Sequence, residues 1–330
     1  MNIPHDPRSS RHALLWIVSV AALVLVAVAS VGFGASSLSV NQLLSDPQAQ
    51  MIVFDIRLPR FVFSAVVGGA LAVIGVVYQS LFRNPLASPF TLGVSSGAAL
   101  GASLALVFPR LGGAVESGAM LGAACSIFVI RAISRRLSIA GEGALLLVGI
   151  VFSFFCSSLL TMVQYLSDYS QLFRVTRWMM GGIPIVGFWD LAVGVGGLVL
   201  VVVWVMRHHR EFDLMLFGDD LAAVKGTDVR QLYDRTFILS SLLIGWIVSK
   251  CGVIGFVGIV IPAMVRLLVG LPHRRVVPLA CLFGAVLVSL CDLLGRVVRP
   301  PFEVPAGVFT SVLGGPIFIL LAIRGVRRLR

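Results

Sequence analysis

Ten stretches without a charged side chain recur along the sequence, and they constrain the fold more than any other feature. The longer ones reach the roughly 20 apolar residues that a helix needs to cross a bilayer. Helices are the expected form, because a backbone polar group in lipid must find its hydrogen-bond partner within the chain. We therefore predict an all-α polytopic membrane protein, with residues 1–330 as one transmembrane domain of about ten spans. The stretches are Leu14–Phe33, Phe61–Phe82, Phe90–Pro109, Ser117–Ile130, Gly143–Ser167, Leu191–Met206, Thr236–Ser249, Cys251–Val265, Val276–Cys291 and Val304–Ile323.

The composition agrees with a chain surrounded by lipid. Hydrophobic residues make up 58% of the chain and charged residues 12%, about half the share that is typical of soluble proteins. The net charge of +11 does not indicate a nucleic-acid partner, because the basic residues lie between apolar stretches and are not interleaved with aromatic ones. The five cysteines show no C-x-x-C spacing, so we predict neither a metal site nor a disulfide framework.

The distribution of basic residues predicts the orientation in the membrane. A short basic tail, residues 1–12, precedes the first stretch, which we interpret as an uncleaved span, although small residues at Ala27–Ala29 leave signal cleavage open. An even number of spans places both termini on one side. Lysine and arginine favour that side by about two to one, so we assign it to the cytoplasm.

One polar segment, residues 207–235, interrupts the apolar pattern between the sixth and seventh stretches. At its centre we predict a short amphipathic helix held between two glycines. A short helix between two spans cannot bury its own polar face, so it lies in water or docks onto a soluble partner. We predict docking, with the partner supplying the energy that the chain uses. The residues concerned are Gly218, Asp219, Asp220, Leu221, Ala222 and Gly226.

The chain itself offers no visible energy source. Its two lysines, Lys225 and Lys250, lie outside any P-loop pattern, so we do not expect it to hydrolyse ATP. A proton-driven carrier needs acids and bases within the membrane. Asp292 is the one acid well inside a span, and Arg296 one turn further on suggests a local ion pair. The histidines are expected in loops, and no cofactor bound by this chain is predicted.

Several motifs then carry a resemblance that covers residues 40–324. In order, they are R-L-P-R at 57–60, R-N-P-L-A at 83–87, G-V-S-S-G at 93–97, W-M-M-G-G at 178–182, G-F-V-G at 255–258 and D-L-L-G-R at 292–296. Together they resemble the permease subunit of ABC importers for iron-siderophores, haem and vitamin B12. Two positions depart from the family pattern, Ala263 where a histidine is usual and Lys225 where an apolar residue is usual.

The resemblance implies a transport function and a set of partners. It implies a non-enzymatic subunit of the bacterial inner membrane that forms a homodimer, with ATP-Mg bound by two cytoplasmic ATPase subunits. It also implies an external binding protein that delivers a metal chelate or cobalamin. Two other functions stay open from the residues alone. One is a stand-alone secondary transporter or channel, and the other is an intramembrane enzyme, for which no acid–histidine cluster is visible.

The resemblance also assigns roles to particular residues, each with a simpler alternative. A stripe on one face of the fifth span is predicted to line the path or to pack helices, two loops to close the path inside, and outer arginines to grip the binding protein. For Glu142 the alternative is a helix cap. For the arginines the alternatives are membrane anchors, or ion pairs of Arg57 with Asp55 and of Arg296 with Asp292. The path residues are Gly149, Ser153, Ser157 and Thr161, the gate residues Asn84, Leu86, Glu142 and Gly143, and the docking residues Arg57, Arg60 and Arg296.

Overall fold

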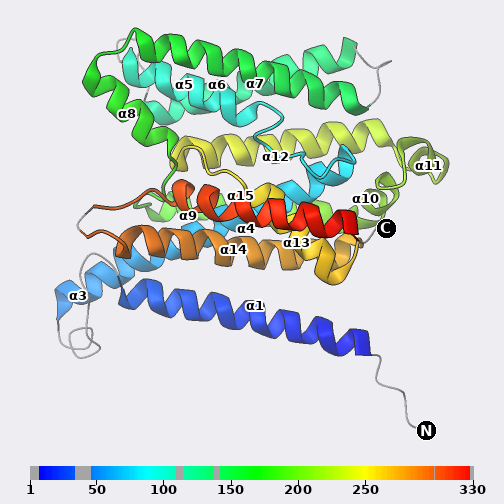
Figure 1. Cartoon of the computed structure of the whole chain (residues 1–330), viewed down its shortest axis with the longest axis horizontal. Helices are drawn as coiled ribbons and strands as arrows, with labels where there is room; N and C mark the ends of the chain where they lie inside the picture. Colours follow the sequence, from blue (N-terminus) through cyan, green and yellow to red (C-terminus); the bar gives the residue numbers. More distant parts are fainter. Residues whose placement is uncertain (1–6, 34–45, 109–113, 137–141, 301, 328–330) are drawn as a thin grey trace.

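A computed structural model describes residues 7–33, 46–108, 114–136, 142–300 and 302–327, and every regular element within them is a helix (Figure 1). The helices are α1 (Pro7–Gly32), α3 (Pro47–Met51), α4 (Leu58–Leu81), α5 (Val94–Val107), α6 (Val115–Arg136), α7 (Glu142–Tyr165), α8 (Tyr169–Met179), α9 (Phe188–Arg207), α10 (His209–Met215), α11 (Asp219–Val224), α12 (Val229–Cys251), α13 (Val257–Val269), α14 (His273–Val297) and α15 (Ala306–Arg327). A π-helical turn, Ile52–Arg57, joins α3 to α4.

The ten predicted apolar stretches each correspond to one helix, in the same order: α1, α4, α5, α6, α7, α9, α12, α13, α14 and α15. Six helical segments of the described chain are long and apolar enough to cross a membrane, and four shorter apolar helices accompany them. The predicted all-helical class is therefore confirmed. The six long segments are Ala13–Gly32, Pro47–Leu81, Leu147–Tyr165, Phe188–Arg207, Val229–Cys251 and His273–Val297.

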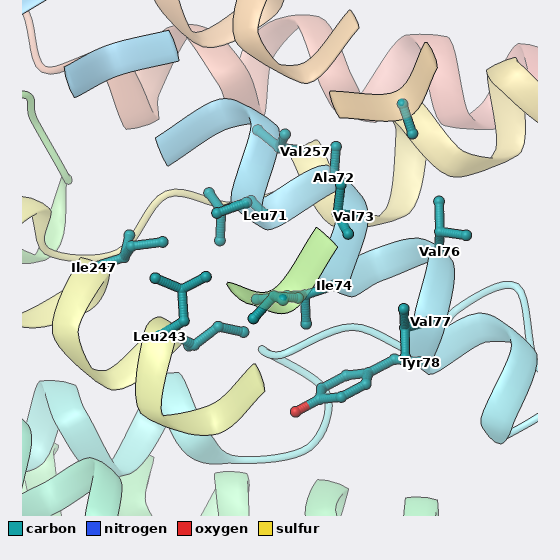
Figure 2. Close-up of a cluster of buried hydrophobic side chains, with 14 of the residues drawn as sticks. Leu71, Ala72, Val73, Ile74, Val76, Val77, Tyr78, Leu243, Ile247 and Val257 are labelled. Atoms are coloured by element: carbon teal, nitrogen blue, oxygen red, sulfur yellow. The ribbon is translucent and has the colours of Figure 1, made fainter. Parts of the chain in front are cut away.

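Helix α4 forms the centre of the bundle. Every residue from Val66 to Leu81 is buried, as expected for a helix that is apolar on all sides. It contacts α1, α9, α10, α12, α13 and α14. Figure 2 shows its side chains packed against Leu243 and Ile247 of α12 and Val257 of α13. Movement of α4 would consequently reach most of the molecule.

Glycines set the close approach of α4 to its neighbours. A Cβ atom built on Gly75 would lie 2.0 Å from the carbonyl oxygen of Gly258 in α13, and one on Gly68 would lie 2.1 Å from that of Gly284 in α14. Only a hydrogen fits at such positions, and the backbones of these helices therefore touch directly. Small residues at these contacts allow the close helix packing that is typical of membrane bundles.

The helices share a common long direction, which gives the molecule two distinct ends (Figure 1). The start of α1, the end of α15, and helices α10 and α11 lie at one end, here called the coupling end. Helices α3 and α8 lie at the other, the far end. The first helix begins at Pro7, so it includes the second half of the predicted tail, residues 1–12. Residues 1–6 lie outside the described part.

Apolar side chains cover much of the outer surface of the bundle. Leu25 and Val28 of α1 and Phe154 of α7 are each about 70% exposed. Apolar faces of this extent would aggregate in water. They fit the hydrocarbon interior of a bilayer or contact with another membrane subunit.

Candidate functional site

The predicted helix of the polar segment is present as α11, at the coupling end. Gly218 precedes it with a φ of 122°, and Gly226 follows it with a φ of 89°. Residues with a Cβ atom rarely adopt such positive φ values, which explains why both positions are glycine. The amide of Thr227 donates to the carbonyl of Ala222 at 3.0 Å and closes the helix. Asp219 and Asp220 lie in its first turn, where acids are favoured.

Helix α11 has one buried face and one exposed apolar face. Ala222 is fully buried, whereas Phe217, Leu221 and Val224 are 71%, 43% and 84% exposed. Three exposed apolar side chains close together in a polar segment are typical of a surface that contacts another molecule. We call Phe217, Leu221 and Val224 the docking face.

The same helix touches the loop that follows α4. A Cβ atom on Gly218 would lie 2.8 Å from Nη1 of Arg83, so that guanidinium packs on the start of α11. Burial raises the pKa of Asp219 above its ordinary value, and the charge of Arg83 offsets this only in part. The Tyr233 hydroxyl donates to the carbonyl of Leu81 at the end of α4. The docking helix and the predicted gate loop are thus in direct contact.

Helix α10 anchors this region to the bundle. Its Phe212 and Met215 are fully buried, and its Asp213 accepts hydrogen bonds from His273. Burial alone would raise the pKa of Asp213, but these hydrogen bonds outweigh it and hold that pKa below its ordinary value. The expectation that every histidine lies in a loop was wrong, since His273 begins α14 and is fully buried.

The predicted gate residues lie in two segments. Asn84 Oδ1 accepts from the amide of Leu86 at 2.8 Å, and Gln79 Nε2 donates to the carbonyl of Pro85 at 3.0 Å, so this turn has a fixed shape. Leu86 remains 47% exposed. Glu142 and Gly143 are the first two residues of α7, a position that suits the helix-cap interpretation of Glu142, whose side chain lies outside the described set.

The predicted path stripe on α7 divides into two parts. Gly149 is buried against Leu92, and Ser153 donates to its own helix at the Gly149 carbonyl, so these two residues pack helices. Ser157 and Thr161 are exposed, and Thr161 donates to the carbonyl of Ser157 at 3.0 Å. The half of the stripe nearer the far end is therefore the exposed part, and its role in a path stays a prediction.

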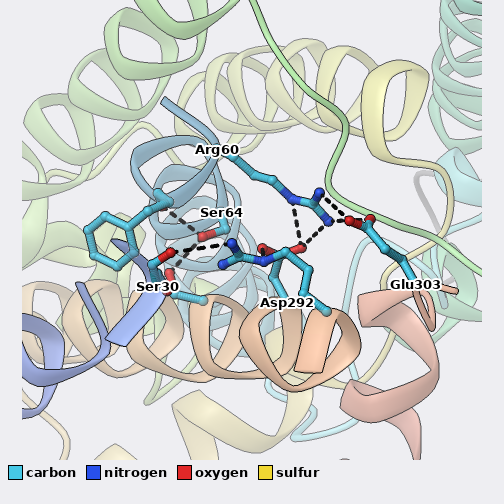
Figure 3. A network of polar contacts seen from close by, with 8 residues as sticks. Ser30, Arg60, Ser64, Asp292 and Glu303 are labelled. Atoms are coloured by element: carbon cyan, nitrogen blue, oxygen red, sulfur yellow. Dashed lines mark hydrogen bonds and ion pairs between the residues drawn. The ribbon is translucent and has the colours of Figure 1, made fainter. Parts of the chain in front are cut away.

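Three buried arginines, Arg57, Arg60 and Arg296, lie at the far end. Figure 3 shows Arg60 between Asp292 and Glu303. Arg60 lies 2.9 Å from Asp292 of α14 and 2.9 Å from Glu303, which precedes α15. Arg296 pairs with Asp292 at 3.2 Å, which confirms the local ion pair. Arg57 donates to the carbonyl of Val31, at the end of α1, at 2.7 Å.

The arginines predicted to dock the binding protein are buried in the single chain. Arg57, Arg60 and Arg296 are 5–8% exposed and bind within the chain. A buried cation needs internal partners, and here the partners come from α1, α14 and the segment before α15. A docking role for these residues stays a prediction, and it would act through the shape of the far end.

A second ion-pair cluster at the far end was missed by the sequence reasoning. Lys250, at the end of α12, lies 2.6 Å from Glu116 of α6 and 3.0 Å from Asp190 of α9. Each residue stands at the border of an apolar stretch, and opposite charges at such borders are the signal that could have found it. The cluster joins three helices that are far apart in the sequence.

A bundle of apolar helices with an exposed docking face on a short helix defines a class: a membrane transport subunit that works with a soluble partner. The comparisons identify the family. Residues 22–324 match the FecCD transport family, and the chain belongs to it.

Relatives and a solved structure agree with that assignment. The chain is 38% identical over 310 residues to the hemin transport system permease protein HmuU of Yersinia pestis, covering 92% of this chain and 93% of that protein. It is 35% identical to the vitamin B12 import system permease protein BtuC of Vibrio cholerae, covering 83% of each. A structure described as the inward-facing conformation of an ABC transporter assigned to the metal-chelate type matches with a TM-score of 0.84 and 31% identity. It covers 94% of this chain and 99% of that one.

The chain is accordingly a permease subunit of an ABC importer. It is a transport subunit and not an enzyme, and ATP hydrolysis belongs to a separate subunit. The alternatives of a stand-alone carrier and of an intramembrane enzyme are set aside. Of the two positions that depart from the family pattern, Ala263 is half-buried on α13 and Lys225 is exposed after α11.

Proposed function

We propose that this permease carries a metal chelate, with haem, cobalamin and ferric siderophores as the candidate cargoes. The names of its relatives support this class, since one is a hemin permease and another a vitamin B12 permease. The chain holds no cofactor of its own in this proposal. Within the described residues no group of three or more histidine, cysteine, aspartate or glutamate side chains could hold a metal ion.

The ten apolar helices cross a bacterial cytoplasmic membrane, with the coupling end in the cytoplasm. The excess of lysine and arginine on that side supports this orientation. Two copies of the chain enclose the path, and α7 lines it with Ser157 and Thr161. Short hydroxyl side chains suit a conduit, because they contact a large cargo without trapping it.

The docking face of α11 inserts into a cleft on the ATPase subunit, one ATPase for each copy of the permease. The observation that carries this proposal is the projection of Phe217, Leu221 and Val224 from a segment otherwise rich in charge. ATP binding by the ATPase then displaces α11, and through it the loop of Asn84 and Leu86 that closes the path.

The external binding protein docks on the far end. Arg174 and Arg177 of α8, and Arg299 after α14, are exposed there and can pair with carboxylates. Arg57, Arg60 and Arg296 hold the underlying helices in place. In this way the buried cluster shapes the surface that the partner meets.

Uptake by proteoliposomes tests the cargo. The permease, its ATPase and its binding protein are reconstituted with ATP inside the vesicles, and haemin, cyanocobalamin and a ferric hydroxamate siderophore are offered separately. We expect one of the three to accumulate only when ATP and the binding protein are both present. Accumulation of none of them, or accumulation that needs no ATP, would contradict the proposal.

A further inference from the structure

Four polar side chains from four different helices form a continuous hydrogen-bonded chain at the coupling end, with a buried middle and partly exposed ends. Their donor–acceptor distances lie between 2.6 and 2.8 Å. The chain runs from the helix before α11 to the last turn of α4. Its members are Asp213 of α10, His273 of α14, Ser80 of α4 and Arg266 of α13.

Asp213 forms the outer end of this chain and holds the start of α14. Its Oδ1 accepts from the backbone amide of His273 at 2.8 Å and from ring Nδ1 at 2.6 Å. The carboxylate also faces the positive end of the α14 dipole. Two hydrogen bonds to one residue fix α10 against α14 more firmly than apolar contact does.

His273 connects this carboxylate to α4. Its ring is fully buried, and Nε2 lies 2.6 Å from the Ser80 hydroxyl. With Nδ1 donating to Asp213, the neutral ring accepts at Nε2, and the Ser80 hydroxyl is the donor that faces it. The Ser80 oxygen also lies 2.8 Å from the Val76 carbonyl of its own helix, so its single hydrogen is shared between these two acceptors.

Arg266 completes the chain from α13. Its Nη2 donates to the Ser80 hydroxyl at 2.8 Å and to the Val76 carbonyl at 3.0 Å. The positive guanidinium at one end and the negative carboxylate of Asp213 at the other balance in charge, and the neutral His273 ring and Ser80 hydroxyl lie between them. A buried network of this kind is stable only when its members keep their geometry, because each lost hydrogen bond leaves a buried polar group unpaired.

Two members of the chain, Asp213 and Ser80, adjoin the two parts that must move together. Residues 216–218 alone separate α10 from α11, which bears the docking face. Ser80 is followed within four residues by Asn84, where the gate loop turns. Apolar helix contacts can slide, whereas a hydrogen-bonded chain transmits a displacement with its direction.

We propose that Asp213, His273, Ser80 and Arg266 form a coupling relay that carries the displacement of α11 to the end of α4 and the gate loop. They are positioning residues for ATP-driven transport, and none of them touches the cargo. The inference rests on the proposed role of α11 and adds the route by which its movement reaches the gate.

Spin-label distances in the permease–ATPase complex test the relay without any cargo. Lys225, which is exposed at the end of α11 and lies outside the docking face, reports α11, and Leu86 reports the gate loop. Each is labelled separately, and its distance is measured between the two copies of the chain. The background lacks the exposed thiol of Cys125. Each distance is recorded without nucleotide and with ATP trapped by vanadate. In the wild-type complex we expect both distances to change.

Ser80→Ala is the test variant and Ser64→Ala its matched control. Both serines are buried on α4 and both bond a side chain of α14, but Ser64 bonds Ser289, away from the relay. In Ser80→Ala we expect the Lys225 change to persist and the Leu86 change to fall at least about threefold. In Ser64→Ala both changes should match the wild type. Asp213→Ala breaks the relay at its exposed end, so it keeps the test available if Ser80→Ala fails to assemble.

The outcomes separate this inference from the proposed function. A Leu86 change that survives in Ser80→Ala or Asp213→Ala, or that falls equally in Ser64→Ala, overturns the relay while α11 keeps its role. An otherwise wild-type complex in which the Lys225 label does not respond to ATP overturns the coupling role of α11, and the relay with it.

Discussion

Single buried charges hold the far end together, and Arg60 is the clearest of them. It binds Asp292 and Glu303 at once, although 232 and 243 residues separate it from them. Arg60→Ala leaves Asp292 buried with Arg296 alone. We expect a loss of about 3–5 kcal/mol in stability, because removal of one partner strands the other charge.

Thermal unfolding of the detergent-solubilised permease measures that loss. The exposed Arg174 of α8 supplies the control, since Arg174→Ala removes the same side chain from the surface. Its midpoint should stay close to that of the wild type. Equal midpoints for the two variants would show that the buried cluster adds nothing to stability.

At this scale the sequence identified which residues are unusual and could not say what they bind. Asp292 with Arg296 was predictable because the two residues stand one helical turn apart. The pairing of Arg60 with Asp292, or of His273 with Asp213, depends on which helices become neighbours. That information is absent from local spacing. The sequence therefore could not show that these arginines are buried or that His273 begins a helix.

Among whole elements, the contact between α4 and α13 depends on Gly75. A methyl group there would meet the Gly258 carbonyl, so Gly75→Ala must push the helices apart at a cost of about 1–3 kcal/mol. Gly196 of α9 has nothing within 4 Å of its would-be Cβ atom. Gly196→Ala should leave the unfolding midpoint unchanged or slightly raised. Comparable losses in both variants would argue against the close approach.

The end of α11 supplies another prediction for an element. Gly226 has a positive φ, which leucine disfavours and asparagine tolerates. Gly226→Leu should weaken co-purification with the ATPase several-fold, whereas Gly226→Asn should retain it. The permease itself should stay folded in both variants. Equal retention of the ATPase would show that the shape of this cap does not matter for docking.

The apolar helices could be predicted from the sequence because length without charge is a strong signal in lipid. The short helices were harder. Helix α11 was found through its two glycines and its isolation, whereas α8 was missed although Asp168 and Gln171 form a capping box at its start. Helix α10 was missed because its buried Phe212 and Met215 look like ordinary loop residues until α4 and α14 are in place.

On the scale of the whole molecule, the coupling end and the far end are each tied to α4. The far end is joined by the arginine cluster, and the coupling end by the contacts of Ser80 and Leu81. Between them every residue from Val66 to Leu81 is buried. A helix that is packed on all sides moves as a rigid unit. Such a helix suits a subunit in which binding of an outer partner must affect an inner one.

The central claim is that a separate ATPase drives transport through α11. Its most direct test is ATP-dependent uptake by proteoliposomes that contain the complex, comparing the wild type with the double variant Asp219→Lys, Asp220→Lys. Asp219 and Asp220 are the first two residues of α11. Lysines at these positions would be disfavoured by the helix dipole and repelled by the nearby guanidinium of Arg83. We expect the variant to insert normally and its uptake to fall by at least about tenfold. Normal uptake by the variant, or uptake by the permease without its ATPase, would contradict the account.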